Sequence, residues 1–241
     1  MIKLEHVVLA SPEQMEFIIE GMRNPMNSWK KTDSGYGCDS GLCSAPCAFS
    51  PQWCGNTPRY VLGENDRSLM RRLSKAGTDH RKFMRMLPVY VRITAPLYWW
   101  NEFDTYKVGT VANICSTMHK IQAKGFILED FSCEHLNRIG TSSLCDIIDI
   151  FNLDRKLYLN GGDYKGEHYA PKDKQVWWQM IQLLPSSYNQ TRNVMMNYEV
   201  LVNIYKSHKN HKLDEWRDFC KWIEELPYSE LITGGTNEKM A

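Results

Sequence analysis

Amphipathic helical segments dominate this sequence, and the few strands do not alternate with them. Apolar residues recur at helical spacing over long stretches at about 12–24, 65–77, 96–106, 142–161, 171–184, 190–208 and 213–226. Only residues 2–9 and 88–94 show the alternation that is typical of strands. Because a doubly wound parallel sheet needs strands and helices in regular succession, this order predicts an α+β fold.

The length and the charge of the chain limit the classes of protein to which it can belong. The 241 residues fit one large domain, or a domain with an insert. Hydrophobic residues make up 43% and charged residues 24%, which is ordinary globular usage. The net charge of +1 provides no global basic field, so we expect no nucleic-acid partner. The chain contains no apolar run long enough for a membrane span and begins without a secretion signal, so we expect a cytoplasmic protein.

Local residues mark several helix ends. Ser11 precedes Pro12, and Gln14 completes a capping box, so a helix should begin there and end at Asn24-Pro25. The same reasoning gives the N-caps expected for two later helices, which are Asn65 and either Ser142 or Ser143.

A cysteine-rich insert at about 32–62 interrupts this pattern. It is rich in Gly, Ser and Pro and shows neither helical nor strand period, which predicts a long irregular loop. Its four cysteines, which are enough for a tetrahedral zinc site, are Cys38, Cys43, Cys47 and Cys54. Their spacing lacks the paired C-x2-C knuckles of zinc ribbons, so reduced thiols without metal are favoured. In a reducing compartment, the other cysteines are interpreted as small buried apolar residues: Cys115, Cys133, Cys145 and Cys220.

Two further segments carry chemical information. A basic run at His80-Arg81-Lys82 is interpreted as a solvated helix end, with a phosphate-contacting patch as the alternative. The stretch 93–120 joins a strand, an Ala-Pro, an aromatic helix and a loop with small polar groups. A bulky apolar wall beside a few fixed hydrogen-bonding groups suits a flat aromatic ligand.

This stretch resembles the flavin-dependent thymidylate synthases, the thymidylate synthase complementing proteins. In that family a strand runs into Ala-Pro, an aromatic helix with Gln, and the motif R-H-R-x-x-S-x-N-x-x-S-x-R. The matching positions here are Ala95-Pro96, Glu102 at the Gln, Thr105-Tyr106-Lys107 at the Arg-His-Arg, Asn113 and Ser116 with one residue inserted, and Met118 at the final Arg.

A second stretch supports the resemblance independently. Leu184-Pro185 is followed by Asn197, Asn203 and His208 at the family's spacing for Asn, Asn and Arg. The segment HKLDEWR, residues 211–217, is similar to the family's closing H-A-Q-x-E-I-R. The resemblance covers residues 75–225 approximately and leaves the cysteine-rich insert outside.

The resemblance implies a fold and an activity. The fold would be a helix-rich single domain with a small central, mainly antiparallel sheet. The activity would be reductive methylation of dUMP to dTMP with FAD, NADPH and methylenetetrahydrofolate, in a homotetramer whose active sites are shared between chains. FAD would contact Lys107, Asn197, Asn203 and His208, and dUMP would contact Glu102, Asn113, Ser116 and Thr117. No residue would act as a covalent nucleophile, and no metal is expected.

The departures from the family motif keep other functions open. A guanidinium clamps phosphate in a way that lysine only approximates, and only Lys107 remains of the Arg-His-Arg. Lys120, Lys206 or Arg81 could substitute for the missing arginines. The alternatives are a degenerate member that binds a nucleotide or a partner protein without turnover, an enzyme acting on another pyrimidine nucleotide, and a cysteine-dependent thymidylate synthase with Cys115 or Cys47 as nucleophile.

Overall fold

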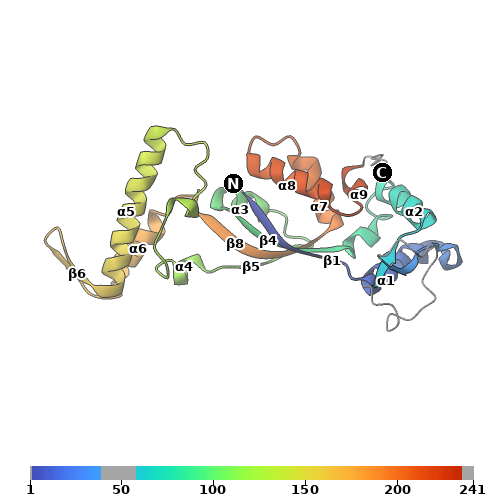
Figure 1. Ribbon diagram of the computed structural model, residues 1–241, viewed down its shortest axis with the longest axis horizontal. Helices are drawn as coiled ribbons and strands as arrows, with labels where there is room; N and C mark the ends of the chain where they lie inside the picture. The colour runs from blue at the N-terminus through green and yellow to red at the C-terminus, as the bar shows by residue number, and fades with distance from the viewer. Residues whose placement is uncertain (1, 39–57, 235–241) are drawn as a thin grey trace. The chain divides into compact units, whose positions relative to one another are not determined.

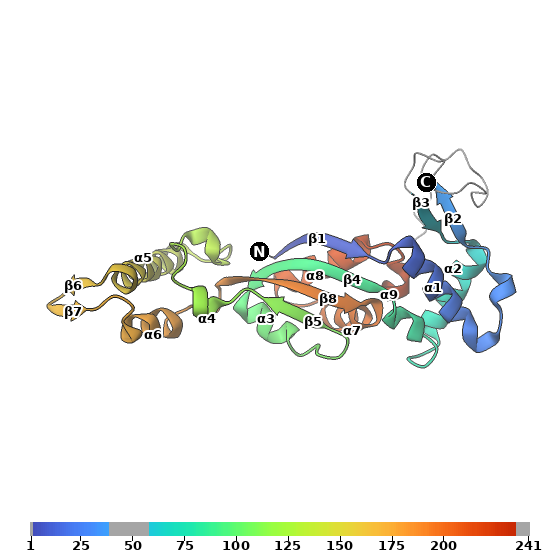
Figure 2. The same cartoon turned by 90° about the horizontal axis from the view of Figure 1, so that it is seen from below.

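The computed structural model describes residues 2–38 and 58–234 and has an α+β fold (Figure 1). Its main sheet is small and mainly antiparallel, with strand order β1-β4-β8-β5, so β4 lies between β1 and β8 (Figure 2). The strands of this sheet are β1 (Lys3–Leu9), β4 (Pro88–Pro96), β5 (Val111–Ile114) and β8 (Asn189–Asn197). The α+β fold predicted from the order of the segments is confirmed.

Helices make up the rest of the regular structure together with two short hairpins. The longer helices are α1 (Pro12–Arg23), α2 (Glu64–Lys75), α3 (Leu97–Phe103), α5 (Arg138–Asn160), α6 (Lys174–Gln182), α7 (Tyr198–His208) and α8 (Asp214–Glu225). The shorter ones are η1 (Asn24–Met26), η2 (Trp29–Lys31), η3 (Lys82–Arg85), α4 (Thr117–Lys120), η4 (Leu128–Asp130) and α9 (Glu230–Thr233). The hairpins pair β2 (Gly35–Cys38) with β3 (Pro58–Val61) and β6 (Gly162–Tyr164) with β7 (Glu167–Tyr169). Among the described residues, no helix combines the length and hydrophobicity that a membrane crossing requires.

Several local predictions are confirmed. The Ser11 side chain accepts from the Gln14 amide, the Gln14 side chain accepts from the Ser11 amide, and Asn24 is the C-cap of α1. Along β4, burial alternates from Val89 to Ile93, as the sequence pattern requires. Pro96 is the N-cap of α3, and the apolar side of α8 is buried.

Three boundary predictions are wrong. Residues 189–197 form β8 and not the first half of a helix, because Arg192, Val194 and Met196 alternate as buried residues. Helix α5 begins at Arg138 with Asn137 as its cap, well before Ser142, because the Asn137 side chain accepts from Gly140 N. The N-cap of α2 is Gly63, and the Asp33 carboxylate accepts from the amides of Asn65 and Asp66.

The insert predicted as an irregular loop has regular ends. Gly35 pairs with Val61 and Tyr36 with Tyr60 in the antiparallel hairpin of β2 and β3. The rest of the cysteine-rich stretch, residues 39–57, lies outside the described residues together with the side chain of Cys38, so the prediction of reduced thiols without metal is not tested.

The chain divides into two compact units. Unit 1 consists of Met1–Leu4, Arg92–Thr105 and Ala112–Asn193, and unit 2 consists of Glu5–Val91, Tyr106–Val111 and Val194–Ala241. In unit 1, α5 packs against α6, and Phe126, Phe131, Phe151 and Met180 lie in its apolar core. In unit 2, α7 packs against α8, α9 and η3. The single domain inferred from the sequence stays a prediction.

The cysteine interpretation needs correction. Cys220 is buried, but Cys115 and Cys145 are exposed and Cys133 is half-buried. Cys115 lies next to β5, all four residues of which are exposed, and Cys145 lies on the outer side of α5. Neither position can serve as apolar core.

A buried carboxylate in α5 gives the fold a pH-dependent stability. Asp154 is 5% exposed, burial raises the pKa of its carboxyl to about 6, and its Oδ2 has no hydrogen-bond partner among the described residues. Because the folded protein then binds this proton more tightly than the unfolded chain, stability should fall as pH rises from about 4 to above 6.

The replacement Asp154→Asn should therefore raise the free energy of unfolding by about 2 kcal/mol near neutral pH and change it little near pH 4. Urea denaturation at both pH values measures this, with the exposed Asp149→Asn on the same helix as control. An equal effect of Asp154→Asn at both pH values would contradict the assignment.

Candidate functional site

The aromatic helix α3 forms a rigid apolar wall in unit 1. Trp99, Trp100 and Phe103 are buried, and the Trp99 and Phe103 rings stack at 5.0 Å between centroids. The Trp100 Nε1 donates to the Gln190 carbonyl at 2.9 Å, which ties the helix to β8. Proline at the N-cap, followed by bulky residues at helical spacing, explains why the chain turns from strand to helix here.

A cavity of about 400 Å³ lies in the same unit. It has a polar and partly charged lining that comes from β1, β4, α4 and its flanks, η4 and the start of β8. The lining residues are Lys3, Thr94, Cys115, Ser116, Thr117, Lys120, Ile121, Lys124, Glu129, Asp130, Tyr188, Asn189, Gln190 and Thr191. Ser116 and Thr117, which the sequence assigned to a nucleotide, both belong to it.

Hydrogen bonds fix the polar groups of this cavity. The Ser116 Oγ accepts from the His119 amide at 3.2 Å, which caps α4. The Gln190 Nε2 donates to the Thr117 Oγ1 at 2.8 Å, and the Thr94 and Thr191 hydroxyls lie 2.7 Å apart. The cavity is thus lined by hydroxyl and amide groups with defined orientations.

A buried arginine holds Gln190 from the other side. The Arg192 Nε donates to the Gln190 Oε1 at 2.9 Å, and its Nη1 pairs with the Asp104 Oδ1 at 2.6 Å. Its guanidinium also lies 4.1 Å from the centroid of the Trp100 ring. Arg192 therefore connects the aromatic wall to the cavity, since Gln190 reaches Thr117 with its other amide atom.

The charged groups that line the cavity have a small positive excess. They are Lys3, Lys120 and Lys124 against Glu129 and Asp130, and Lys124 forms an ion pair with Asp130. The side chains of Lys3 and Lys120 are exposed. A phosphate group can be held by exposed ammonium groups of this kind, although without the bidentate geometry that arginine provides.

Two other residues assigned to the nucleotide lie elsewhere in unit 1. Asn113 is exposed on β5, and Glu102 is half-buried on α3; neither lines the cavity. Their assignment to dUMP stays a prediction.

The residues assigned to FAD belong to unit 2. Asn197 ends β8 and caps α7, because its Oδ1 accepts from the Val200 amide at 3.1 Å. Gly109, at φ +81°, faces this cap: a Cβ at Gly109 would lie 3.0 Å from the Asn197 Nδ2 and 3.1 Å from the Val200 Cγ2. The loop before β5 can therefore approach α7 closely only because residue 109 is glycine.

The replacement Gly109→Ala should destabilise the protein by about 2 kcal/mol or more, since it combines backbone strain with a close contact. Gly77→Ala is the matched control, because Gly77 has a φ of +103° but no atom within 4 Å of an added Cβ. Thermal denaturation of both variants measures the difference. An equal loss in both would mean that the contact with Asn197 has no cost.

His208 lies in an aromatic cluster at the end of α7. Its ring stacks on Trp216 at 3.8 Å, and its Nε2 lies 2.8 Å from the Tyr106 hydroxyl. Leu201, Ile204 and His208 are all buried on α7. Tyr106 stands where the family has the His of Arg-His-Arg, so this matched position contacts the matched end of the second stretch.

The remaining FAD candidates are accessible. Lys107 and Asn203 are both exposed, as is Lys206. Arg81 was interpreted as part of a solvated helix end, which is wrong: it is buried, and its Nε pairs with the Glu199 Oε1 at 3.2 Å. Arg85 pairs with the other oxygen of Glu199, so one carboxylate forms ion pairs with two arginines. Arg81 cannot also serve as the missing phosphate clamp.

Sequence reasoning found part of this site and missed part. It selected Ser116 and Thr117 at the cavity but overlooked Gln190, Arg192 and Lys124. The signal for the first two was weak, because Val194 and Met196 are apolar at strand spacing but the third buried residue of this strand is the charged Arg192. The helical interpretation of this segment concealed it.

Comparison of the sequence with family models and with curated proteins gives no match. Comparison of the fold with solved structures gives several. A thymidylate synthase X (ThyX) from Helicobacter pylori, solved with FAD and dUMP, matches with a TM-score of 0.57 at 13% identity, covering 95% of this chain and 94% of that chain. A second structure of ThyX from the same organism, also with FAD and dUMP, has the same score and identity and covers 95% of each chain.

A third match is the UMP/dUMP methylase PolB from Streptomyces cacaoi, bound with 5-Br UMP. Its TM-score is 0.55 at 10% identity, and the match covers 97% of this chain and 95% of that chain. Because the sequence identities are low, these matches establish the fold alone. Each match extends over nearly the whole chain. This protein has the fold of the flavin-dependent thymidylate synthase ThyX.

Proposed function

We propose that this protein methylates a pyrimidine nucleotide, with dUMP to dTMP as the first reaction to test and UMP as the second substrate. The observation that carries the proposal is the cavity at Ser116 and Thr117, in a fold similar to proteins solved with dUMP or 5-Br UMP. Two residues selected from the sequence for nucleotide binding line a cavity of suitable size together with three lysines.

The chemistry of the cavity supports a uridine nucleotide. The uracil ring needs groups that both donate and accept hydrogen bonds, which Ser116, Asn189 and Gln190 can provide. Lys3 and Lys120 supply positive charge for the phosphate in place of the arginines that the family motif contains. Positioning of the pyrimidine by fixed amide and hydroxyl groups is the contribution that this chain would make to the reaction.

The proposed reaction uses FAD as its cofactor, and the polar side chains of unit 2 are compatible with FAD binding. Lys107 and Asn203 are exposed and can pair with the phosphates of the cofactor. Asn197 is engaged in the α7 cap and His208 in the aromatic cluster, so these two side chains would position the FAD site without bonding to the phosphates. When bound, FAD would supply the hydride chemistry, with NADPH as reductant and methylenetetrahydrofolate as one-carbon donor. The homotetramer with active sites shared between chains is part of the same proposal.

The absorbance spectrum of the untreated purified protein tests the cofactor directly. An isoalloxazine band that persists after dialysis supports the proposal, and its loss in Lys107→Gln would assign that residue. A colourless protein that takes up no added FAD would contradict a flavin-dependent reaction.

Ser116→Ala should weaken dUMP binding by about tenfold while leaving flavin occupancy unchanged, because the hydroxyl lines the cavity in unit 1 and the FAD candidates belong to unit 2. Titration calorimetry with dUMP, alongside the flavin spectrum, measures both effects. Ser143→Ala on the exposed side of α5 is the control. Equal loss of both ligands, or of neither, would remove Ser116 from the nucleotide site.

One observation favours a second candidate function. Cys115 is exposed and lines the same cavity, where a thiol could attack the pyrimidine as in cysteine-dependent thymidylate synthases. Under the flavin-dependent proposal, Cys115→Ser keeps most of its methylating activity. Complete loss of turnover with intact dUMP binding would favour the cysteine-dependent reaction. Binding of dUMP without any product in the wild type would indicate a degenerate member.

A further inference from the structure

A second hollow, of about 550 Å³, lies in unit 2 between the η1–η2 turn and α2. Among the described residues, its lining contains four cations and no acidic residue; those that matter here are Arg23, Lys30, Lys31, Arg72, Ser28 and Ser68. Lys30, Lys31, Arg72 and Ser68 are exposed on its rim. None of these residues belongs to the pyrimidine cavity or to the FAD candidates.

The floor of this hollow is held rigidly. Arg23 is buried and donates from Nε to the Asp66 Oδ1 at 2.6 Å. Its Nη2 donates to the Lys31 carbonyl at 3.0 Å, and its Nη1 lies 3.3 Å from the Ser28 carbonyl. One guanidinium therefore fixes the turn that carries both exposed lysines and links it to Asp66 of α2.

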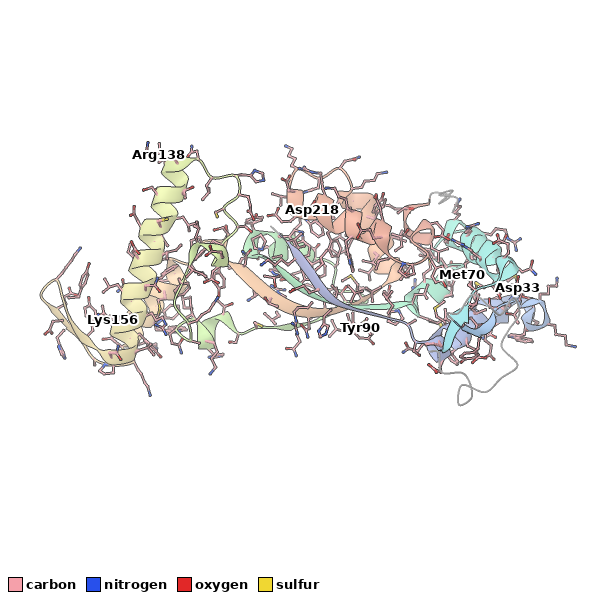
Figure 3. All side chains as sticks on the ribbon, viewed as in Figure 1. Asp33, Met70, Tyr90, Arg138, Lys156 and Asp218 are labelled. Carbon is pink, nitrogen blue, oxygen red and sulfur yellow. The ribbon has the colours of Figure 1, made fainter. Side chains whose placement is uncertain are left out.

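The acidic groups of this region are already engaged. The Asp66 carboxylate is paired with Arg23. The carboxylate of Asp33, which is labelled in Figure 3, accepts from the amides of Asn65 and Asp66 at the start of α2. On the same helix, Arg71 lies 3.8 Å from Glu64, and Arg67 lies 2.9 Å from Glu230. Within the part of the chain that the structure describes, no ion pair engages Lys30, Lys31 or Arg72, and all three line the hollow.

We propose that this hollow binds a compact oligophosphate, meaning two or more adjacent phosphate groups of a small molecule. Three exposed cations around a preformed polar floor match several negative charges held close together. The net charge of +1 argues against an extended nucleic acid, which needs a continuous basic surface. A nucleoside triphosphate and a dinucleotide such as NADPH both carry the required group.

The test uses inorganic tripolyphosphate as the probe and the full-length protein. Titration calorimetry at low salt should give saturable binding, which weakens by about tenfold or more in the triple variant Lys30→Gln, Lys31→Gln, Arg72→Gln. The control is Lys156→Gln, Lys165→Gln, Lys174→Gln, which removes the same charge from exposed lysines of unit 1. The control variant should bind like the wild type.

Further arms identify the source of the phosphates and separate this site from the proposed function. ATP and NADPH are titrated in the same way, and the one that binds more tightly identifies the chemical class of the natural ligand. Binding of dUMP should be unchanged in the triple variant, because Ser116 and its cavity are untouched. Absence of saturable tripolyphosphate binding, equal weakening in both triple variants, or preference for a single-stranded oligonucleotide would each overturn the proposal.

Discussion

Replacing Asp66 with alanine is expected to lower the free energy of unfolding by about 3–5 kcal/mol, the largest stability effect that we predict. The side chain of Asp66 is fully buried, and its Oδ2 accepts from the Thr32 Oγ1 at 2.7 Å and the Ser34 Oγ at 2.6 Å. Its removal would leave the buried Arg23 guanidinium without its counter-charge, and a buried unpaired charge is costly.

The matched control for Asp66→Ala is Asp218→Ala on α8. Asp218 forms an exposed ion pair with Lys221 at 2.9 Å, so its loss should cost less than about 1 kcal/mol (Figure 3). Urea denaturation of both variants gives the comparison. A loss of similar size in the two would mean that the Arg23–Asp66 pair contributes no more than a surface pair.

The contribution of Asp66 should also depend on pH. Burial alone would raise the pKa of its carboxyl, but hydrogen bonds from Ser34, Thr32 and Arg23 outweigh it and hold this pKa below the usual range. Because the folded pKa is the lower one, the stabilisation is complete above about pH 4 and is lost as the pH falls further. The difference between wild type and Asp66→Ala should therefore shrink in acid.

Replacing Arg192 with methionine should weaken dUMP binding by about tenfold and lower the free energy of unfolding by about 2 kcal/mol. Methionine can still cover the Trp100 ring, so the variant mainly removes the charge. Gln190 then loses the donor to its Oε1, and its Nε2 is no longer held toward the Thr117 hydroxyl. Affinity is lost because the cavity no longer presents a fixed amide.

The control for Arg192 is Arg92→Met on the neighbouring strand β4. Arg92 is exposed, and its Nε lies 3.5 Å from the Asn193 Oδ1, so its loss should change neither stability nor dUMP binding appreciably. Titration calorimetry with dUMP on both variants measures the difference in affinity. If Arg192→Met binds dUMP like the wild type, Gln190 is not held by Arg192 in the way we infer.

The sequence was most informative where local chemistry alone determines structure. The Ser11 capping box, the alternation along β4 and the proline before α3 depend on neighbouring residues, and all three are confirmed. It failed where a distant partner decides. β8 is a strand because β4 and β5 flank it in the sheet. The N-terminus of α2 is capped by Asp33, which precedes Asn65 by 32 residues in the sequence.

The same distinction applies to the candidate site. Ser116 and Thr117 could be selected because small polar residues follow an aromatic helix in one continuous stretch. Arg192 could not be connected with them, because its orientation depends on Asp104, which lies 88 residues away in the sequence and is brought close only by the fold. Arg81 illustrates the opposite error, since a basic run in sequence contains a side chain that the fold buries against Glu199.

Transfer of a labelled one-carbon unit tests the central claim most directly. The protein is incubated with FAD, NADPH, dUMP and methylenetetrahydrofolate labelled at the transferred carbon, and the nucleotide is analysed by mass spectrometry. We predict label in the methyl group attached to C5 of the pyrimidine, with far less product from Ser116→Ala. Bound dUMP that stays unlabelled under these conditions, with UMP equally inert, would contradict the proposed methylation.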